Sequence, residues 1–182
     1  MNYPIKSGRI LLRPMAVSDA PRVYAYRNEP AVARFQGWTP ETVTEVEDHA
    51  LNMQAWGNDI AGRCIQLVIE QQENLAIGVM GDMAFSLDTE TKAQAELGIA
   101  VDPAFQKQGF AHEAVTGLVS ALFDQLKLHR IHVSIDPANR ASRMLFERVG
   151  FRLEGHLRKS VYFKGAWCDD IVMAVLGEEW GE

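Results

Sequence analysis

The sequence has few cysteines and no long apolar run, and each shortage excludes a class of protein. Its two cysteines, Cys64 and Cys168, form no C-x-x-C pair, so neither a zinc site nor a thioredoxin-like motif is indicated. Isolated cysteines are typical of reduced thiols in a cytosolic protein. No segment approaches the roughly 18 consecutive apolar residues of a membrane span, and residues 1–6 contain no apolar signal-peptide core. We therefore expect a soluble, cytoplasmic protein that does not enter a membrane.

The sequence also has fewer basic than acidic residues. Lys and Arg number 18 against 24 Asp and Glu, which gives a formal net charge of −6. Because phosphate backbones are bound by basic surfaces, we expect no nucleic-acid partner. The sequence contains no Walker lysine motif, no G-x-G-x-x-G fingerprint and no clear metal-ligand cluster. Binding of nucleoside triphosphates, dinucleotides or a metal is therefore not expected.

The chain shows no internal repeat, low-complexity tract or Gly/Ser-rich linker. Its length of 182 residues suits one domain with a sizeable core. Its 47% hydrophobic and 23% charged residues are typical of globular proteins. We therefore expect a single domain over residues 1–182.

Local signals predict the elements of the first part of the chain. A strand is expected over 9–13, followed by a helix that is capped by Ser18 and has Pro21 in its first turn. A second helix is expected to begin at Thr39 and Pro40, a cap residue followed by proline.

The middle and end of the chain alternate between strand and helix periods. Three strands form an expected antiparallel meander, with connections at 71–74 and 87–90: 64–69, 76–85 and 95–101. The remaining elements, in chain order, are a helix over 109–126, a strand over 130–135, a helix over 139–149 closed by Gly150, and strands over 151–163 and 167–176 joined at 164–166. Grouped strands with helices between them predict an α+β fold, a mixed sheet with helices on its faces.

The segment 106–114 carries the clearest chemical signal, because it leads from a strand into a long helix. A helix start presents unpaired N–H groups and the positive end of the helix dipole, which favours an anion. Gly109 allows close approach of the backbone to a ligand, and Lys107 offers a point charge for a phosphate. The alternative is a plain strand-to-helix turn.

The pattern Gln106-x-x-Gly109-x-Ala111 resembles the Q/R-x-x-G-x-G/A motif of the GNAT N-acetyltransferases, in which loop amides hold the pyrophosphate of acetyl-CoA. Further segments resemble the RimJ/RimL branch of that family and occur in the same order: 9–14, 18–20, 95–103, 109–114, 136–142, 147–151 and 165–169. The resemblance covers almost the whole chain.

The resemblance implies the GNAT fold: a mixed, mostly antiparallel sheet of about seven strands, with helices on both faces, that opens between its fourth and fifth strands. It also implies acetyl-CoA as co-substrate, with the pantetheine arm in that gap. The positions expected to contact the cofactor are Ile99 and Val101 on the strand, Gln106, Lys107, Gln108, Gly109, Phe110 and Ala111 in the loop, and Asn139, Ser142 and Phe146 beyond it.

Acetyl transfer to an amine needs a base, a polarised carbonyl and a stabilised thiolate. Glu96 is the first candidate for the base, because some GNAT enzymes have a glutamate at the corresponding strand position. Asp82 is the second candidate. The alternative for each is a solvent-facing or paired carboxylate.

Ser142 is the second catalytic candidate, because its hydroxyl could donate to the thioester or the departing sulfur. The alternatives are a first-turn serine at this position and an N-cap at Asn139. Phe146 stands where many GNAT enzymes carry a proton-donating tyrosine, and a phenyl ring cannot donate. For His112, His129, His132 and His156, a structural role is favoured over a catalytic one.

The acceptor is less well defined by the sequence. In this fold the amine enters past the first helices and the last hairpin, where one set of mostly aromatic residues could line a slot: Phe35, Gln36, Gly37, Trp38, Trp56, Tyr162 and Trp167. A protein N-terminal amine is the leading acceptor. A small amine (a polyamine, amino acid or aminoglycoside) is the second reading, and a catalytically silent acyl-CoA-binding module is the third. Monomers and homodimers both occur in the family.

Overall fold

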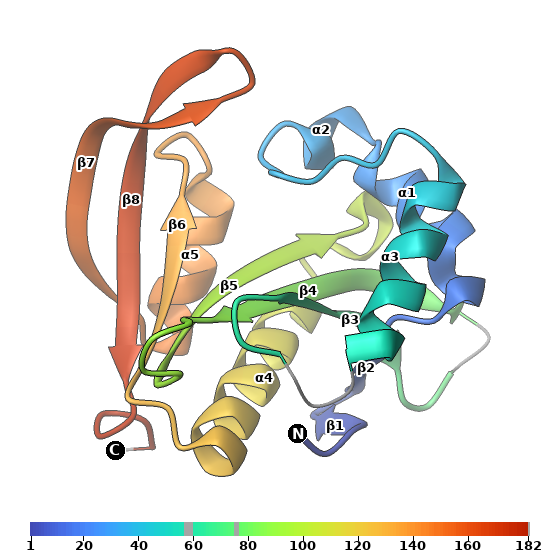
Figure 1. Cartoon of the computed structure of the whole chain (residues 1–182), viewed down its shortest axis with the longest axis horizontal. Helices are drawn as coiled ribbons and strands as arrows, with labels where there is room; N and C mark the ends of the chain where they lie inside the picture. Colours follow the sequence, from blue (N-terminus) through green and yellow to red (C-terminus); the bar gives the residue numbers. More distant parts are fainter. Residues whose placement is uncertain (57–59, 75–76, 182) are drawn as a thin grey trace.

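The computed structural model describes residues 1–56, 60–74 and 77–181, and its strands form one eight-stranded sheet (Figure 1). The strands lie in the order β1-β2-β3-β4-β5-β6-β8-β7, and every neighbouring pair is antiparallel except β5 with β6. Their bounds are β1 Ile5–Ser7, β2 Ile10–Pro14, β3 Cys64–Gln71, β4 Val79–Leu87, β5 Gln94–Val101, β6 Arg130–Ile135, β7 Arg152–Phe163 and β8 Ala166–Leu176. The predicted α+β architecture with a mixed, mostly antiparallel sheet is confirmed, with eight strands instead of about seven.

Helices cover both faces of this sheet. On one face, α4 (Phe110–Leu126) packs against Met83 and Phe85 of β4 in the larger apolar core, which α5 (Arg140–Val149) extends. The opposite face is covered by α1 (Ala20–Arg27) and α3 (Val43–Trp56), around a second buried cluster. The short α2 (Pro30–Ala33) follows α1. Within the described part of the chain, no helix is long and apolar enough to cross a membrane.

Several boundaries follow the local signals in the sequence. Gly109 has φ +89° and directly precedes α4, and Gly150, with φ +111°, ends α5. These are left-handed conformations that glycine adopts without steric cost. The Asn139 side chain accepts a hydrogen bond from the Ser142 backbone at 3.2 Å, so asparagine caps α5. The predicted 64–101 meander is confirmed by the antiparallel pairs of β3, β4 and β5.

Two predicted helix caps are wrong. α1 is entered through the 3-10 turn η1 (Val17–Asp19), where the Asp19 carboxylate, not Ser18, accepts a backbone N–H, that of Ala16 at 2.8 Å. The second helix begins at Val43, because the Thr42 hydroxyl, not that of Thr39, accepts from the backbone N–H at position 45.

Three other elements depart from the prediction. Strand β1 and helix α2 were not expected, because three and four residues are too short to show a period. β4 begins at Val79, and residue 76, the predicted start of this strand, lies outside the described residues.

The sheet opens into a fork between β5 and β6 (Figure 1). The two strands are paired over three residues, from Gln94 with Arg130 to Glu96 with His132. β5 continues to Val101 on one arm of the fork, whereas β6 continues on the other arm with β8. The backbone of β5 beyond Glu96 therefore has a free edge that faces the gap, as the resemblance implied for its fourth and fifth strands.

Candidate active site

A cleft of about 750 Å³ lies along the free edge of β5. Its walls come from α2, β5, the loop before α4, the first turn of α4, and α5. The lining residues are Ala31, Val32, Phe35, Gln36, Ile99, Ala100, Val101, Phe105, Gln106, Lys107, Gly109, Ala111, His112, Glu113, Asn139, Ala141, Ser142, Met144, Leu145 and Arg148. Segments more than 100 residues apart in the sequence thus meet around one space.

The backbone of β5 offers acceptors along this cleft. The carbonyl of Ile99 accepts a hydrogen bond from the Gln36 side-chain amide at 3.1 Å, and the carbonyl of Val101 accepts one from the Gln106 amide at 2.9 Å. Side-chain amides therefore occupy positions at which β6 would donate if the sheet stayed closed. A carbonyl oxygen has two lone pairs, so each still has capacity for a ligand amide.

The loop 106–111 ends in a helix start with no side-chain cap, since Gly109 occupies the cap position of α4. The first N–H groups of α4 are therefore available to an anion at the cleft wall. Lys107 also has a left-handed backbone, with φ +61°, and lines the cleft. The arrangement suits a phosphate held by backbone N–H groups with a lysine beside it.

Arg9, which the sequence reasoning did not single out for this role, anchors the loop from the far end of the chain. Its guanidinium donates to the Glu113 carboxylate at 2.5 Å and to the Gln108 carbonyl at 2.8 Å. It also lies over the Phe110 ring, 4.4 Å from the centroid. Partial burial opposes ionisation of Glu113, but the hydrogen bonds from Arg9 hold the pKa of this carboxyl below its ordinary value.

The opposite wall is one face of α5. Asn139 and Ser142, the residues predicted to contact the cofactor here, line this wall together with Leu145 and Arg148, which the sequence analysis missed. A three-residue spacing from Ser142 through Leu145 to Arg148 places all three on one helix face, and this period is the signal that could have identified them. Arg148 adds an exposed cation to the wall.

Three residues predicted to contact the cofactor do not line the cleft. The Gln108 side chain donates to the Ala104 carbonyl at 2.9 Å, and the Phe110 ring is buried beneath Arg9. The Phe146 ring is 2% exposed and packs edge-on against Phe151, with centroids 5.0 Å apart. The Phe110 and Phe146 side chains face the protein interior, so only their backbone groups are left for a ligand, whereas the exposed Gln108 side chain is turned back to the loop before it.

The two candidate bases have contrasting environments. Asp82 is fully buried, and its oxygens are engaged by Arg27, the Tyr26 hydroxyl and Gln66. A carboxylate so fully paired is not available as a base. Glu96 is exposed and lies at the base of the fork, paired in register with Ser86 of β4 and His132 of β6.

Glu96 does not line the cleft but stands next to it along β5. Gly98 follows on the same face of the strand, because side chains two residues apart point the same way. A Cβ added at Gly98 would meet no heavy atom within 4 Å, so the space beside Gly98 is open.

The residues predicted to form an acceptor slot separate into three places. Phe35 and Gln36 line the cleft. The rings of Tyr162 and Trp167 pack edge-on on the β7–β8 hairpin, with centroids 5.5 Å apart, and both side chains are more than half exposed. The hairpin also contacts α2, since the Lys164 ammonium donates to the Ala33 carbonyl at 2.6 Å.

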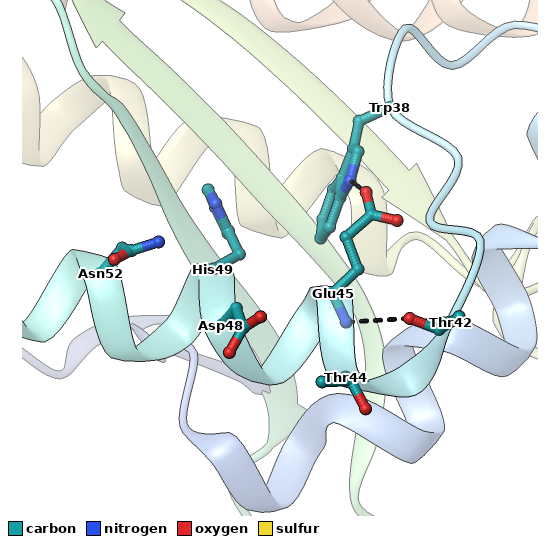
Figure 2. A pocket seen from close by; sticks show the side chains of 7 residues that line it. All are labelled: Trp38, Thr42, Thr44, Glu45, Asp48, His49 and Asn52. Carbon is teal, nitrogen blue, oxygen red and sulfur yellow. Dashed lines mark hydrogen bonds between the residues drawn. The ribbon is translucent and has the colours of Figure 1, made fainter.

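Trp38 belongs to a separate surface pocket of about 410 Å³ on α3, which Figure 2 shows. There its indole donates to Glu45 at 2.8 Å and its ring lies 5.0 Å from that of His49. Hydrogen bonds from the Glu41 backbone and from Trp38 hold the pKa of Glu45 below its ordinary value. The carboxylate therefore stabilises the start of α3, and the pocket shares no lining residue with the larger cleft.

Comparison with known proteins agrees with this geometry. The family model "Acetyltransferase (GNAT) domain" matches residues 9–152. The uncharacterized N-acetyltransferase YnaD of Bacillus subtilis is 27% identical over 97% of this chain and 98% of its own. The [ribosomal protein uS5]-alanine N-acetyltransferase of Escherichia coli is 29% identical over 46% of this chain and 43% of its own.

A solved structure shares the fold across nearly the whole chain. It is the spermidine N-acetyltransferase of Vibrio cholerae in complex with CoA and spermine, which superposes with a TM-score of 0.80 at 22% identity and covers 96% of this chain and 99% of its own. The forked sheet and the matched family model lead to one conclusion: the chain belongs to the GNAT family of acetyltransferases and is an acyltransferase.

Proposed function

We propose that the cleft binds acetyl-CoA and that the protein transfers the acetyl group to a protein N-terminal amine. The observation that carries the proposal is the free edge of β5 leading directly to the uncapped start of α4. An extended pantetheine arm can pair with the carbonyls of Ile99 and Val101, and its pyrophosphate then meets the N–H groups of the loop 106–111. Lys107 supplies positive charge within that loop, and Arg148 adds a second cation to the lining of the cleft.

The reaction requires the amine to lose a proton before its lone pair can attack the thioester. Glu96 is the proposed base, because it is exposed at the fork and the open space at Gly98 lets an amine approach it. Ser142 is the proposed hydrogen-bond donor to the thioester or the leaving sulfur, since it lines the cleft on the facing wall. Phe146 is buried away from the cleft, so no tyrosine-like donor is proposed at that position.

An N-terminal peptide is favoured as acceptor because the acceptor side is open. Tyr162 and Trp167 stand 64% and 59% exposed on the hairpin beside α2, where they can stack against a peptide. The likeness to the uS5-alanine enzyme supports this choice over less than half of each chain. The second candidate is a small polyamine, favoured by the net charge of −6 and by the fold shared with the spermidine enzyme.

The test is an acetylation assay that follows CoA release with three groups of acceptors. These are peptides with a free N-terminus, the same peptides with a blocked N-terminus, and small amines including spermidine. Transfer to free N-termini alone supports the proposal, whereas a preference for spermidine supports the second candidate. CoA binding without transfer to any acceptor would show a silent binding module and overturn both.

A further inference from the structure

Four polar side chains form a row across the sheet at the base of the fork. Cys64 of β3 is in register with Ser86 of β4, Ser86 with Glu96 of β5, and Glu96 with His132 of β6. Directly paired residues on neighbouring strands point to the same face of the sheet. Their neighbours Ala95 and Ile131 are buried in the core on the α4 side, so the row faces the opposite side.

The position of the row relates it to the reaction proposed above. Glu96 and His132 are the last residue pair before β5 and β6 separate. The pair therefore sits where the open space at Gly98 meets the base of the fork. A proton that leaves an amine in this space meets Glu96 on β5 first. His132 lies beside Glu96 on the neighbouring strand, β6.

His132 has an unused nitrogen in this setting. Its Nδ1 is buried and has no hydrogen-bond partner in the part of the chain that the structure describes. A buried polar atom without a partner is uncommon and calls for a functional or structural reason. Adjacent strands place paired side chains about 5 Å apart, which is within reach of one hydrogen bond or one bridging water.

We propose that His132 acts through Glu96 as the second member of a proton relay, an inference that rests on the proposed acetyltransferase function. The ammonium substrate gives one proton to the Glu96 carboxylate, and the resulting acid passes it to neutral His132, which releases it to solvent. The amine lone pair forms the C–N bond to the acetyl carbon, and the C–S bond breaks. The second proton of the nitrogen neutralises the departing thiolate, so the products are the amide, CoA thiol and one free proton.

The charges around His132 suit an acceptor that is neutral before the reaction. Burial and the Arg130 guanidinium lower the pKa of His132, whereas Glu96 on β5, Glu154 on β7 and a hydrogen bond with the Ala95 backbone raise it. Arg130 is itself paired with Glu154, which limits its repulsion of an imidazolium. At the other end of the row, Cys64 is exposed at the surface, but partial desolvation by its neighbours raises the pKa of its thiol, so Cys64 remains a thiol and does not compete for the proton.

The relay is tested by kinetics on a small set of variants: His132→Gln, Glu96→Gln, the double variant, and His129→Gln as an exposed control three residues away. His132→Gln should lower kcat by about tenfold, below the 10²-fold or more expected for loss of the primary base, and leave KM for acetyl-CoA unchanged. It should also shift the acid limb of the pH–kcat profile. In the Glu96→Gln background the second substitution should have no further effect.

The outcomes separate this inference from the proposed function. If the wild type is inactive on every acceptor, both the proposed acetyltransferase function and the proposed relay are overturned. An active wild type with equal losses for His132→Gln in both backgrounds overturns the relay alone, because a structural role does not depend on Glu96. An NMR titration of the His132 ring adds a measurement without substrate. Glu96→Gln should lower the ring pKa, since a nearby carboxylate raises it, and an unchanged titration overturns the contact.

Discussion

Replacing Arg27 by methionine should lower the free energy of unfolding far more than most single substitutions do, because it leaves the charge of Asp82 buried without its partner. The Asp82 side chain is 0% and the Arg27 side chain 5% exposed, and the two form an ion pair. Arg27 Nε also donates to Asp82 Oδ1 at 3.0 Å, and its Nη1 donates to the Trp38 carbonyl at 2.8 Å. The guanidinium thus joins α1, β4 and the segment before α3.

Removing one member of a buried ion pair destabilises a protein by about 3–5 kcal/mol. This is a large share of the roughly 5–15 kcal/mol that stabilises a typical domain. Tyr26 and Gln66 still donate to Asp82 in the variant. The loss in free energy of unfolding should therefore lie in the lower part of that range, at about 3–4 kcal/mol. With a urea m-value of about 2 kcal/mol/M, the unfolding midpoint should fall by about 1.5–2 M.

The assay is urea unfolding followed by circular dichroism, with Arg22→Met as the matched control. Arg22 lies on the same helix and pairs with Asp102, but its side chain is 43% exposed, so its loss should amount to about 1 kcal/mol or less. Arg27→Lys keeps the charge without the planar fork and should fall between the two. Equal, small losses for Arg27→Met and Arg22→Met would refute the reasoning, because the buried pair would then be worth no more than an exposed one.

Three further predictions concern the cofactor, the leaving group and pH. Gly109→Asp should abolish acetyl-CoA binding measured by calorimetry, while the control Gly165→Asp, at a similar φ of +88° on the hairpin, should retain it. Unchanged affinity in Gly109→Asp would refute the assignment of the loop 106–111 as the phosphate site. Ser142→Ala should lower kcat roughly tenfold, the effect of one hydrogen bond of about 1.4 kcal/mol, and an unchanged rate would exclude Ser142. Backbone hydrogen bonds from Gln94 and Thr91 lower the pKa of Asp88 to about 2. Because this folded-state pKa lies below the unfolded one, the stabilisation is present above about pH 4 and is lost as the pH falls toward 2. The gap in melting temperature between wild type and Asp88→Asn should therefore narrow over that window, and a constant gap would contradict it.

The parts of the fold that the sequence predicted are those with local causes. The period of α4 and the glycines at 109 and 150 depend on residues within one or two turns, and each boundary agrees with the structure to within a residue. The cap of α3 was misplaced because Thr39 and Thr42 carry the same local signal. Only the folded chain shows that the hydroxyl of Thr42 receives the N–H at position 45.

The candidate site also contains parts that local sequence signals could predict and parts that depend on contacts between distant residues. The loop 106–111 was recognisable because its proposed function, phosphate binding, depends on one contiguous backbone segment. Arg9 contacts that loop from about 100 residues away, and Gln36 reaches the Ile99 carbonyl across 63 residues, so no local pattern could connect them. Asp82 was considered as a base because a lone carboxylate in a strand gives no sign that Arg27, on a separate helix, neutralises it.

The hydrogen bond from Lys164 to the Ala33 carbonyl also bears on how this protein could change its substrate over evolutionary time. The contact links the hairpin on one arm of the fork to α2 on the other, and its acceptor is backbone, not side chain. Every amino acid at position 33 supplies that oxygen. The side chain at position 33 can therefore vary while the two arms stay joined, so the surface of α2 beside the proposed acceptor side can change without loss of this link.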